Sequence, residues 1–392
     1  MAKTTFYKEG ENLIIRLGSV IDASNASDVE KELFTIRKEN TDGALVLDAA
    51  DLTYISSAGL RSVLKLQKQE KNLTLVNASK EVYDVFDMTG MTKVMEIQKK
   101  LRDVSIEGLK KIGQGGTAAV YQLDEDKIIK VYKPVFPLDV IRKEKEISQK
   151  LFLTGVPTAV PYEVVKCGDE IGVIYELLYA KTLLDLMISD PEHGEDYVRM
   201  MADFFKETSA IEVKDFPEIK PMMRMSIYAW IKAGLITQEE MPKYAKIYDN
   251  VPDAEGFVHG DYHPGNIMKV GDELMMIDLA SASKGHKIMD LAGLGTFLFS
   301  LAEYMTPERY TAFTGLTPET GKNLFRAFID YYFKDADEAY ARKAETQILV
   351  IANTRVVSGA AAVPDLISRE SALAAKAYID EHYETALLPI EF

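Results

Sequence analysis

The fold of this chain is decided by the stretch His259-Gly260-Asp261-Tyr262-His263-Pro264-Gly265-Asn266. It combines the carboxylate of Asp261 with the amide of Asn266. Asp278 follows the apolar run Met276-Ile277 and so ends an expected strand. Oxygen atoms of this kind suit Mg²⁺, and a carboxylate can take a proton from a hydroxyl group. The three residues therefore indicate a site that handles phosphate with the help of a metal.

The spacing of Asp261 and Asn266 matches the H-R-D-x-x-x-x-N loop of kinases. By that comparison Asp261 accepts or orients the proton of the acceptor hydroxyl, and His259 braces the loop. Asn266 and Asp278 are the expected Mg²⁺ ligands. A metal site built on His259 and His263 is the competing interpretation, but no further set of histidines and cysteines lies nearby.

A glycine-rich stretch lies well before this loop, at 112–120. Gly113, Gly115 and Gly116 would let the backbone approach the phosphates of a nucleotide, with N–H groups facing them. Ala118 stands where the kinase pattern has its third glycine. Taken alone, the stretch is equally typical of an ordinary hairpin turn.

Lys130 lies within the apolar strand-like run 127–131 and needs a partner, because a lone buried ammonium is costly. In kinases such a lysine contacts the nucleotide phosphates and pairs with a glutamate from a helix. The helical pattern at 141–152 offers Glu144, which shares a face with Ile147 and Leu151. Asp290 is expected to anchor the 259–266 loop from a later helix, although a carboxylate there could also be a simple helix N-terminal charge.

The 259–266 loop, followed by Ile277-Asp278, resembles the aminoglycoside phosphotransferase and choline kinase superfamily. Ordinary protein kinases have Arg where Gly260 stands and D-F-G where Asp278-Leu279-Ala280 stands. The resemblance covers about residues 106–392 and implies an α+β bilobal, protein kinase-like domain that uses ATP and Mg²⁺. It implies a small lobe at about 106–178, a large lobe at 179–392, and a hinge where the backbone of Glu176 and Leu178 meets adenine.

Residues 1–103 show a different pattern, in which short apolar runs alternate with helical segments. The runs 13–15, 44–47 and 73–76 read as buried strands, and 26–38, 58–70 and 80–88 read as helices. Asp22, Ser24 or Asn25 could cap the first helix and Ser79 the third. This alternation predicts an α/β domain. The charged segment 98–103 is expected to be the junction with the second domain.

The run Tyr54-Ile55-Ser56-Ser57-Ala58-Gly59-Leu60 resembles the STAS domains of anti-sigma factor antagonists, as does the segment 82–91. The resemblance places Ser57 on the serine that partner kinases phosphorylate in that family, although Ser56 replaces the aspartate that often precedes it. The alternative is that Ser57 only caps the helix that follows. A phosphate at Ser57 would gain from the helix dipole. The resemblance also implies a protein partner for this domain.

The composition narrows the classes of partner. A formal net charge of −15 argues against nucleic-acid binding and against attraction to an anionic membrane. The single cysteine, Cys167, excludes an internal disulfide, and the N-terminus lacks the apolar run of a signal peptide. The longest apolar stretch, about 291–302, is too short to span a bilayer. We therefore expect a cytoplasmic protein.

Three functions follow from these patterns. The first is an ATP-dependent kinase that phosphorylates a hydroxyl group on a small molecule or a protein, with the STAS-like domain as regulatory or partner-binding module. The second is a protein serine kinase that acts on Ser57, in cis or in trans. The third is a non-catalytic nucleotide-sensing scaffold, which is favoured by Ala118 in place of the third glycine and by the absence of a D-F-G motif. The methionine-rich stretch 221–230 could line an acceptor pocket, but helix core is the more usual role.

Overall fold

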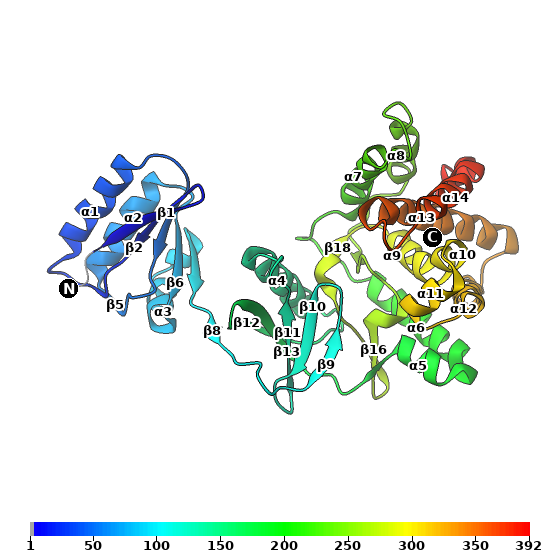
Figure 1. The fold of residues 1–392 in the computed structure, drawn as a ribbon, viewed down its shortest axis with the longest axis horizontal. Helices are drawn as coiled ribbons and strands as arrows, with labels where there is room; N and C mark the ends of the chain where they lie inside the picture. Colours follow the sequence, from blue (N-terminus) through cyan, green and yellow to red (C-terminus); the bar gives the residue numbers. More distant parts are fainter. Residues whose placement is uncertain (1–3) are drawn as a thin grey trace. The chain divides into compact units, whose positions relative to one another are not determined.

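The computed structural model describes residues 4–392, and the chain divides into two compact units. The first takes the chain up to Ser105 together with Val165–Gly168, and the second takes Ile106–Val164 and Asp169–Phe392. Figure 1 shows the ribbon coloured along the sequence. Within residues 4–392, no helix is both long enough and apolar enough to cross a membrane.

The first unit is built on a five-stranded sheet with the order β1-β2-β4-β6-β7. β1 and β2 form an antiparallel hairpin, and the remaining neighbours are parallel. Helices α1 and α2 pack against each other (Figure 1). The elements are β1 (Thr5–Glu9), β2 (Asn12–Arg16), β3 (Val20–Ile21), α1 (Ala26–Glu39), β4 (Leu45–Asp48), β5 (Tyr54–Ile55), α2 (Ser57–Gln69), β6 (Thr74–Ala78), α3 (Lys80–Met88), η1 (Met91–Lys93), β7 (Glu96–Lys99) and β8 (Arg102–Asp103).

The charged segment 98–103 contains the end of β7 and all of β8, which pairs in parallel with β12 (Pro161–Cys167), and the first unit ends just after it, at Ser105. One expectation for this unit needs correction. Ser57 does not cap α2. The cap is Ser56, whose extended backbone lets its hydroxyl accept the N–H of Gly59 at 3.4 Å, whereas Ser57 is already the first helical residue. For α1, Asn25 holds the cap position without a side-chain cap bond, and Ser79 caps α3 as predicted.

In the second unit β13, β11, β10 and β9 pair as antiparallel neighbours in that order, with β12 beside β13, and one long helix, α4, accompanies them. Their bounds are β9 (Lys111–Gln114), β10 (Ala118–Gln122), β11 (Lys127–Tyr132), α4 (Leu138–Thr154), β12 (Pro161–Cys167) and β13 (Glu170–Glu176). The strand residues Ile129, Val131 and Val173 are almost fully buried. This small lobe presents β11 and α4 to the rest of the unit.

The large lobe is mostly helical (Figure 1). Its helices are α5 (Leu183–Ser189), η2 (Pro191–His193), α6 (Gly194–Ser209), α7 (Ile219–Lys232), α8 (Met241–Asp249), α9 (Ile288–Gly295), η5 (Thr296–Ser300), α10 (Leu301–Tyr304), α11 (Pro307–Thr314), α12 (Pro318–Tyr332), α13 (Glu338–Ala362), α14 (Arg369–Glu381) and α15 (Tyr383–Ala386). Short strands and turns carry the loop between them: β14 (Lys181–Thr182), β15 (Phe257–Val258), η3 (Pro264–Asn266), β16 (Ile267–Val270), β17 (Glu273–Met276), η4 (Leu279–Ser281) and β18 (Ser283–Lys284).

Helix α13 is the centre of this lobe. It packs against α7, α9 and α14, and it is buried around most of its circumference between Ala344 and Ala360. A helix that is apolar on all sides belongs in a protein core. The methionine-rich stretch expected to be helix core is only partly so, because α7 buries Ile227 and Trp230 but leaves Met225 67% exposed.

Candidate active site

The glycine-rich stretch forms the turn between β9 and β10, closed by the N–H of Gly115 donating to the carbonyl of Ala118 at 2.9 Å. Neither crowding nor a left-handed backbone requires glycine here. A Cβ at Gly116 would meet nothing within 4 Å, and one at Gly113 or Gly115 would make only ordinary contacts. The open space beside Gly113, Gly115 and Gly116 belongs to a cavity that these residues line.

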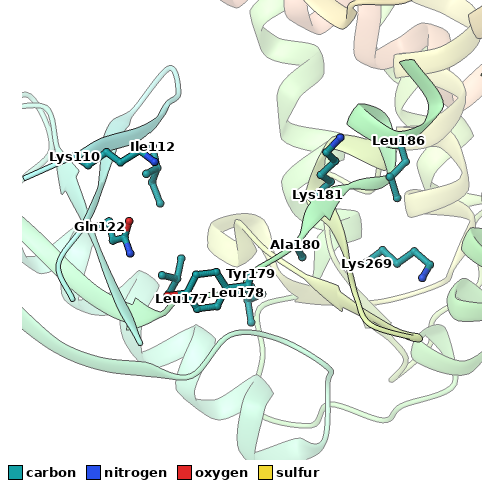
Figure 2. Close-up of a pocket in the computed structure, with 10 residues that line it drawn as sticks. All are labelled: Lys110, Ile112, Gln122, Leu177, Leu178, Tyr179, Ala180, Lys181, Leu186 and Lys269. Carbon is teal, nitrogen blue, oxygen red and sulfur yellow. The ribbon is translucent and has the colours of Figure 1, made fainter. Parts of the chain in front are cut away.

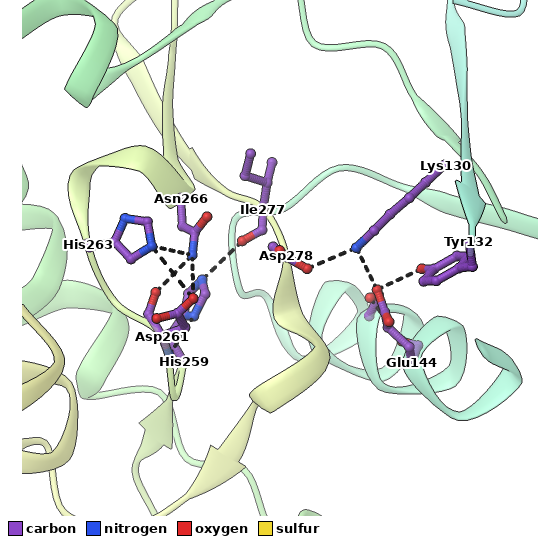
Figure 3. Close-up of polar contacts among 10 residues, drawn as sticks. Lys130, Tyr132, Glu144, His259, Asp261, His263, Asn266, Ile277 and Asp278 are labelled. Carbon is purple, nitrogen blue, oxygen red and sulfur yellow. Dashed lines mark hydrogen bonds and ion pairs between the residues drawn. The ribbon is translucent and has the colours of Figure 1, made fainter. Parts of the chain in front are cut away.

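Lys130 lies between two carboxylates that come from different parts of the chain (Figure 3). Its Nζ is 2.8 Å from Glu144 Oε1 on α4 and 2.9 Å from Asp278 Oδ1 at the end of β17. Burial lowers the pKa of Lys130, but the charges of Asp278 and Glu144 outweigh it and raise the pKa above its ordinary value. The ammonium is therefore permanently charged and held at the junction of the two lobes.

Asp278 itself has an unusual backbone. Its φ is +61°, in the left-handed region that non-glycine residues rarely adopt. Such strain persists only where the surroundings impose it, and it concentrates at functional sites. Here the left-handed turn carries the chain from β17 into η4 and leaves the carboxylate half exposed, facing Lys130.

The 259–266 loop is braced from within by His259, which is fully buried. Its Nε2 lies 3.1 Å from the carbonyl of Ile277, and its Nδ1 accepts the N–H of Asp261 at 3.3 Å. Burial lowers the pKa of His259, so the ring is neutral, with its proton on Nε2. One ring thus ties the loop to the strand end that carries Asp278.

Asp261 and Asn266 are joined across the loop. The Asn266 amide donates to the Asp261 carbonyl at 2.9 Å and to Asp261 Oδ2 at 3.3 Å. Burial opposes ionisation of Asp261, but the nearby His263 and Arg355 hold its pKa well below the usual range, so it is a carboxylate. Within residues 4–392 the amide oxygen of Asn266 accepts no hydrogen bond, which leaves it available to a ligand.

A cavity of about 620 Å³ lies between the lobes beside these groups. That volume is in the usual range for small-molecule sites. Its lining includes the three glycines, Lys130, Glu144, Glu176, Leu178 and Asp278. In the described part of the chain the backbone N–H of Leu178 donates no hydrogen bond, whereas the Glu176 carboxylate is occupied by the N–H of Val160 at 3.2 Å.

A second cavity of about 710 Å³ lies along the segment 177–180 (Figure 2). The two share Ile112, Leu177, Leu178 and Ala180. Lys110, Lys181 and Lys269 stand around the second cavity, and none of its lining residues is acidic. The two cavities are therefore neighbours, and the charged side chains that line the second are all basic.

The sequence reasoning gave no role near the site to Tyr132, Phe297 and Arg355, and it considered His263 only as a possible metal ligand. Tyr132 is buried and donates its hydroxyl to Glu144 Oε1 at 2.7 Å. His263 faces Asp261 Oδ2 at 3.6 Å and stacks on Phe297, with ring centroids 4.3 Å apart. Phe297 comes from η5, a π-helical turn, and such turns often occur at functional sites.

The third missed residue is Arg355, on α13. Its Nη2 donates to the carbonyl of Gly260 at 2.8 Å. One local signal existed, because Arg355 is the only charged residue in the otherwise apolar and small-polar segment 346–364. A lone charge in a buried helix needs a partner, but nothing in the sequence indicates which partner it has.

Comparison with known proteins adds the following. A family model described as "Phosphotransferase enzyme family" matches residues 108–309, and one described as "STAS domain" matches residues 4–104. BtrV of Bordetella bronchiseptica, named as an anti-sigma factor antagonist, is 34% identical over 99 residues, which are 24% of this chain and 84% of that protein. An anti-sigma-B factor antagonist of Staphylococcus epidermidis is 26% identical over 89 residues, covering 22% of this chain and 82% of its own.

Solved structures are more distant in sequence. A thermostable mutant of aminoglycoside phosphotransferase APH(4)-Ia is 11% identical, with a TM-score of 0.48, over 71% of this chain and 94% of its own. The ternary complex of APH(2")-IIa with streptomycin and ATP is 18% identical, with a TM-score of 0.45, over 80% of this chain and 99% of that one.

Proposed function

Because the chain belongs to the phosphotransferase enzyme family and carries a STAS domain before it, we propose that it transfers the γ-phosphoryl group of ATP to a hydroxyl group. The family matches confirm both predicted families. They also confirm the fold class, an α/β STAS domain followed by an α+β bilobal kinase-like domain. The observation that carries the proposed chemistry is the position of Lys130, between Glu144 and Asp278 at the edge of the interlobe cavity.

The nucleotide would lie in the 620 Å³ cavity. Its phosphates would face the turn of Gly113, Gly115 and Gly116 and the ammonium of Lys130, whose direction Glu144 fixes. The unused N–H of Leu178 is suited to the adenine ring, and Glu176 lines the same cavity. Lys130 would then exchange its contact with Asp278 for phosphate oxygens while it keeps Glu144.

Mg²⁺ fits the residues present. Within residues 4–392 no group of three His, Cys, Asp or Glu side chains could hold a metal. Mg²⁺ at phosphoryl-transfer sites needs fewer protein ligands, however, because substrate phosphates and waters complete its shell. The exposed carboxylate of Asp278 and the unused amide oxygen of Asn266 would hold it. When bound, it would supply charge neutralisation along the phosphate chain.

Asp261 would act on the acceptor. Its carboxylate takes or orients the proton of the acceptor hydroxyl while the acceptor oxygen bonds to the γ-phosphorus. The bond from that phosphorus to the β–γ bridging oxygen breaks, and ADP leaves. His259 and Asn266 hold the peptide and the carboxylate of Asp261 in place for this step.

The test separates binding from transfer. Calorimetry should detect Mg²⁺–AMP-PNP binding to the wild-type chain and to Asp261→Ala, while the variant loses ATP consumption. Asp272→Ala, at the exposed tip between β16 and β17, is the matched control and should consume ATP like the wild type. Absence of nucleotide binding would sink the proposal. Binding without turnover in the wild type would favour the nucleotide-sensing scaffold.

A second candidate function is phosphorylation of Ser57, favoured by the position of that residue. Ser57 is exposed in the first turn of α2, which contains no acidic side chain. The partial positive charge of the helix N-terminus would stabilise a phosphate there. The STAS domain would then be a switch that controls a protein partner. Mass spectrometry after incubation with Mg²⁺–ATP decides: an unmodified Ser57 peptide, in this chain and in added STAS chains, rules the function out.

The acceptor in the leading proposal is a hydroxyl-bearing small molecule or protein. Asp261 is 55% exposed, and it is absent from the lining of both cavities between the lobes. The acceptor would therefore approach the carboxylate from outside the nucleotide cavity.

A further inference from the structure

Gly260, the residue immediately before Asp261, is held at both of its backbone polar groups. Asp290 on α9 accepts the N–H of His259 at 2.7 Å and the N–H of Gly260 at 2.8 Å. Arg355 on α13 donates to the carbonyl of Gly260 at 2.8 Å. The two contacts come from helices that follow the loop in the chain, and they meet on one glycine whose φ is +83°.

Glycine at this position has no side chain through which the loop could be fixed. Its left-handed backbone is easily adopted by glycine, but the same freedom allows many alternatives. A Cβ here would lie 2.4 Å from the carbonyl oxygen of Ser281, so the space is closed to any other residue. The conformation must therefore be imposed from outside, through the N–H and the carbonyl of Gly260.

Arg355 directs its hydrogen bonding to this carbonyl, and its charge also acts on Asp261 and Asp290. Within residues 4–392 it makes no ion pair at 4 Å or less, and its one hydrogen bond is to Gly260. Its neighbours on α13, Thr354 and Val356, are fully buried. A Cβ at Gly293 on α9 would lie 3.8 Å from the guanidinium carbon of Arg355. The absence of a side chain at Gly293 therefore leaves space for the guanidinium beside α9. Burying part of a guanidinium costs free energy, and here its hydrogen bond goes to a backbone carbonyl of the loop.

We propose that Arg355 is a positioning residue for phosphoryl transfer, which holds the Gly260 carbonyl and thereby aims the carboxylate of Asp261. The loop lacks an arginine of its own at position 260, and α13 brings a guanidinium against that same peptide. Displacement of a reacting group by about 1 Å can cost ~10²-fold in rate. The expected effect on kcat rests on the proposed function, whereas the restraint of the loop by Arg355 does not depend on it.

Arg355→Met removes the donor and keeps most of the apolar stem. We expect kcat for ATP consumption to fall by about 10- to 100-fold, with KM for ATP within about twofold of wild type, because the nucleotide cavity does not include Arg355. Arg355→Lys should recover part of kcat, since an ammonium can still donate to the carbonyl. Arg369→Met is the matched control: Arg369 also donates to backbone carbonyls, those of Ala233 and Gly234, and should leave kcat unchanged.

Hydrogen exchange in the nucleotide-free chain gives a readout that needs no turnover. The peptide covering 257–266 should exchange faster in Arg355→Met and not in Arg369→Met. Wild-type kcat together with unchanged exchange in Arg355→Met would overturn the inference. Faster exchange in a chain whose wild type consumes no ATP would leave the loop restraint standing and remove the proposed function instead. If Arg355→Met does not fold, Arg355→Gln takes its place in both measurements, and because its shorter, neutral side chain falls short of the Gly260 carbonyl, it should show the same loss of kcat and the same faster exchange.

Discussion

Gly260→Ala tests how far the conformation of the 259–266 loop depends on having no side chain at position 260. The new Cβ would lie 2.4 Å from the carbonyl oxygen of Ser281 and 2.8 Å from its Cβ, so backbone must move. A left-handed alanine costs about 1–2 kcal/mol. Forcing an extra carbon into packed surroundings costs a further 1–3 kcal/mol or so. The expected loss of unfolding free energy is therefore about 2–5 kcal/mol.

Gly271→Ala supplies the control. Gly271 also has a positive φ, +60°, but a Cβ there would meet nothing within 4 Å. Its substitution should cost only the backbone penalty of about 1–2 kcal/mol. The difference between the two variants, about 1–3 kcal/mol, isolates the collision with Ser281.

Unfolding in urea, followed by the fluorescence of Trp230, measures both variants. Trp230 is the single tryptophan, is fully buried, and lies in the same unit as both glycines. The Gly260→Ala midpoint should fall well below that of Gly271→Ala, and only Gly260→Ala should lose ATP consumption. Equal midpoints and equal rates would show that Ser281 yields freely and that the close approach does not hold the loop.

Two further predictions concern single hydroxyl groups. Tyr132→Phe removes a hydrogen bond to the Glu144 carboxylate that is worth about 1.5–3 kcal/mol. It should therefore lower kcat/KM for ATP by tenfold or more in steady-state assays. The control, Tyr121→Phe on the neighbouring strand, should have the kcat/KM of the wild type. Ser79→Ala removes the cap of the helix Lys80–Met88 and should destabilise it by about 1 kcal/mol. Native-state hydrogen exchange of the full chain would show this as faster exchange in that helix, and unchanged exchange would contradict the cap.

Local chemistry accounts for the parts of the fold that could be predicted from sequence. The helix Lys80–Met88 has a serine cap at one end and Thr89-Gly90 at the other, and both of its bounds follow from them. Lys130 could be paired with Glu144 because a lysine in an apolar strand needs an anion, and the helical period leaves few choices. The start of α2 was wrong by one residue, since Ser56 and Ser57 offer the same hydroxyl and only the backbone distinguishes them.

The rest depends on contacts that no local pattern encodes. Arg355 contacts Gly260 because α13 packs beside α9. The hydrophobic periodicity of either helix does not indicate which other helix it packs against. The stacking of Phe297 on His263 depends on a π-helical turn, whose wider hydrogen bonding is not visible in residue types. The roles of the gathered residues remain predictions for the experiments above.

The π-helical turn at Thr296–Ser300 has a consequence for how this gene can change. It accommodates extra chain between α9 and α10 without bending the helix out of the core. Loss of one residue there would return the turn to ordinary helical bonding and leave α9 and α10 in their present orientation, because the wide turn already absorbs the extra residue. The segment that would change is the turn itself, and with it the stacking of Phe297 on His263. A one-residue deletion here should therefore keep Leu301 and Ala302 in the interior but remove the aromatic contact to the 259–266 loop, whereas a deletion at the open tip at Gly271 should leave that contact intact.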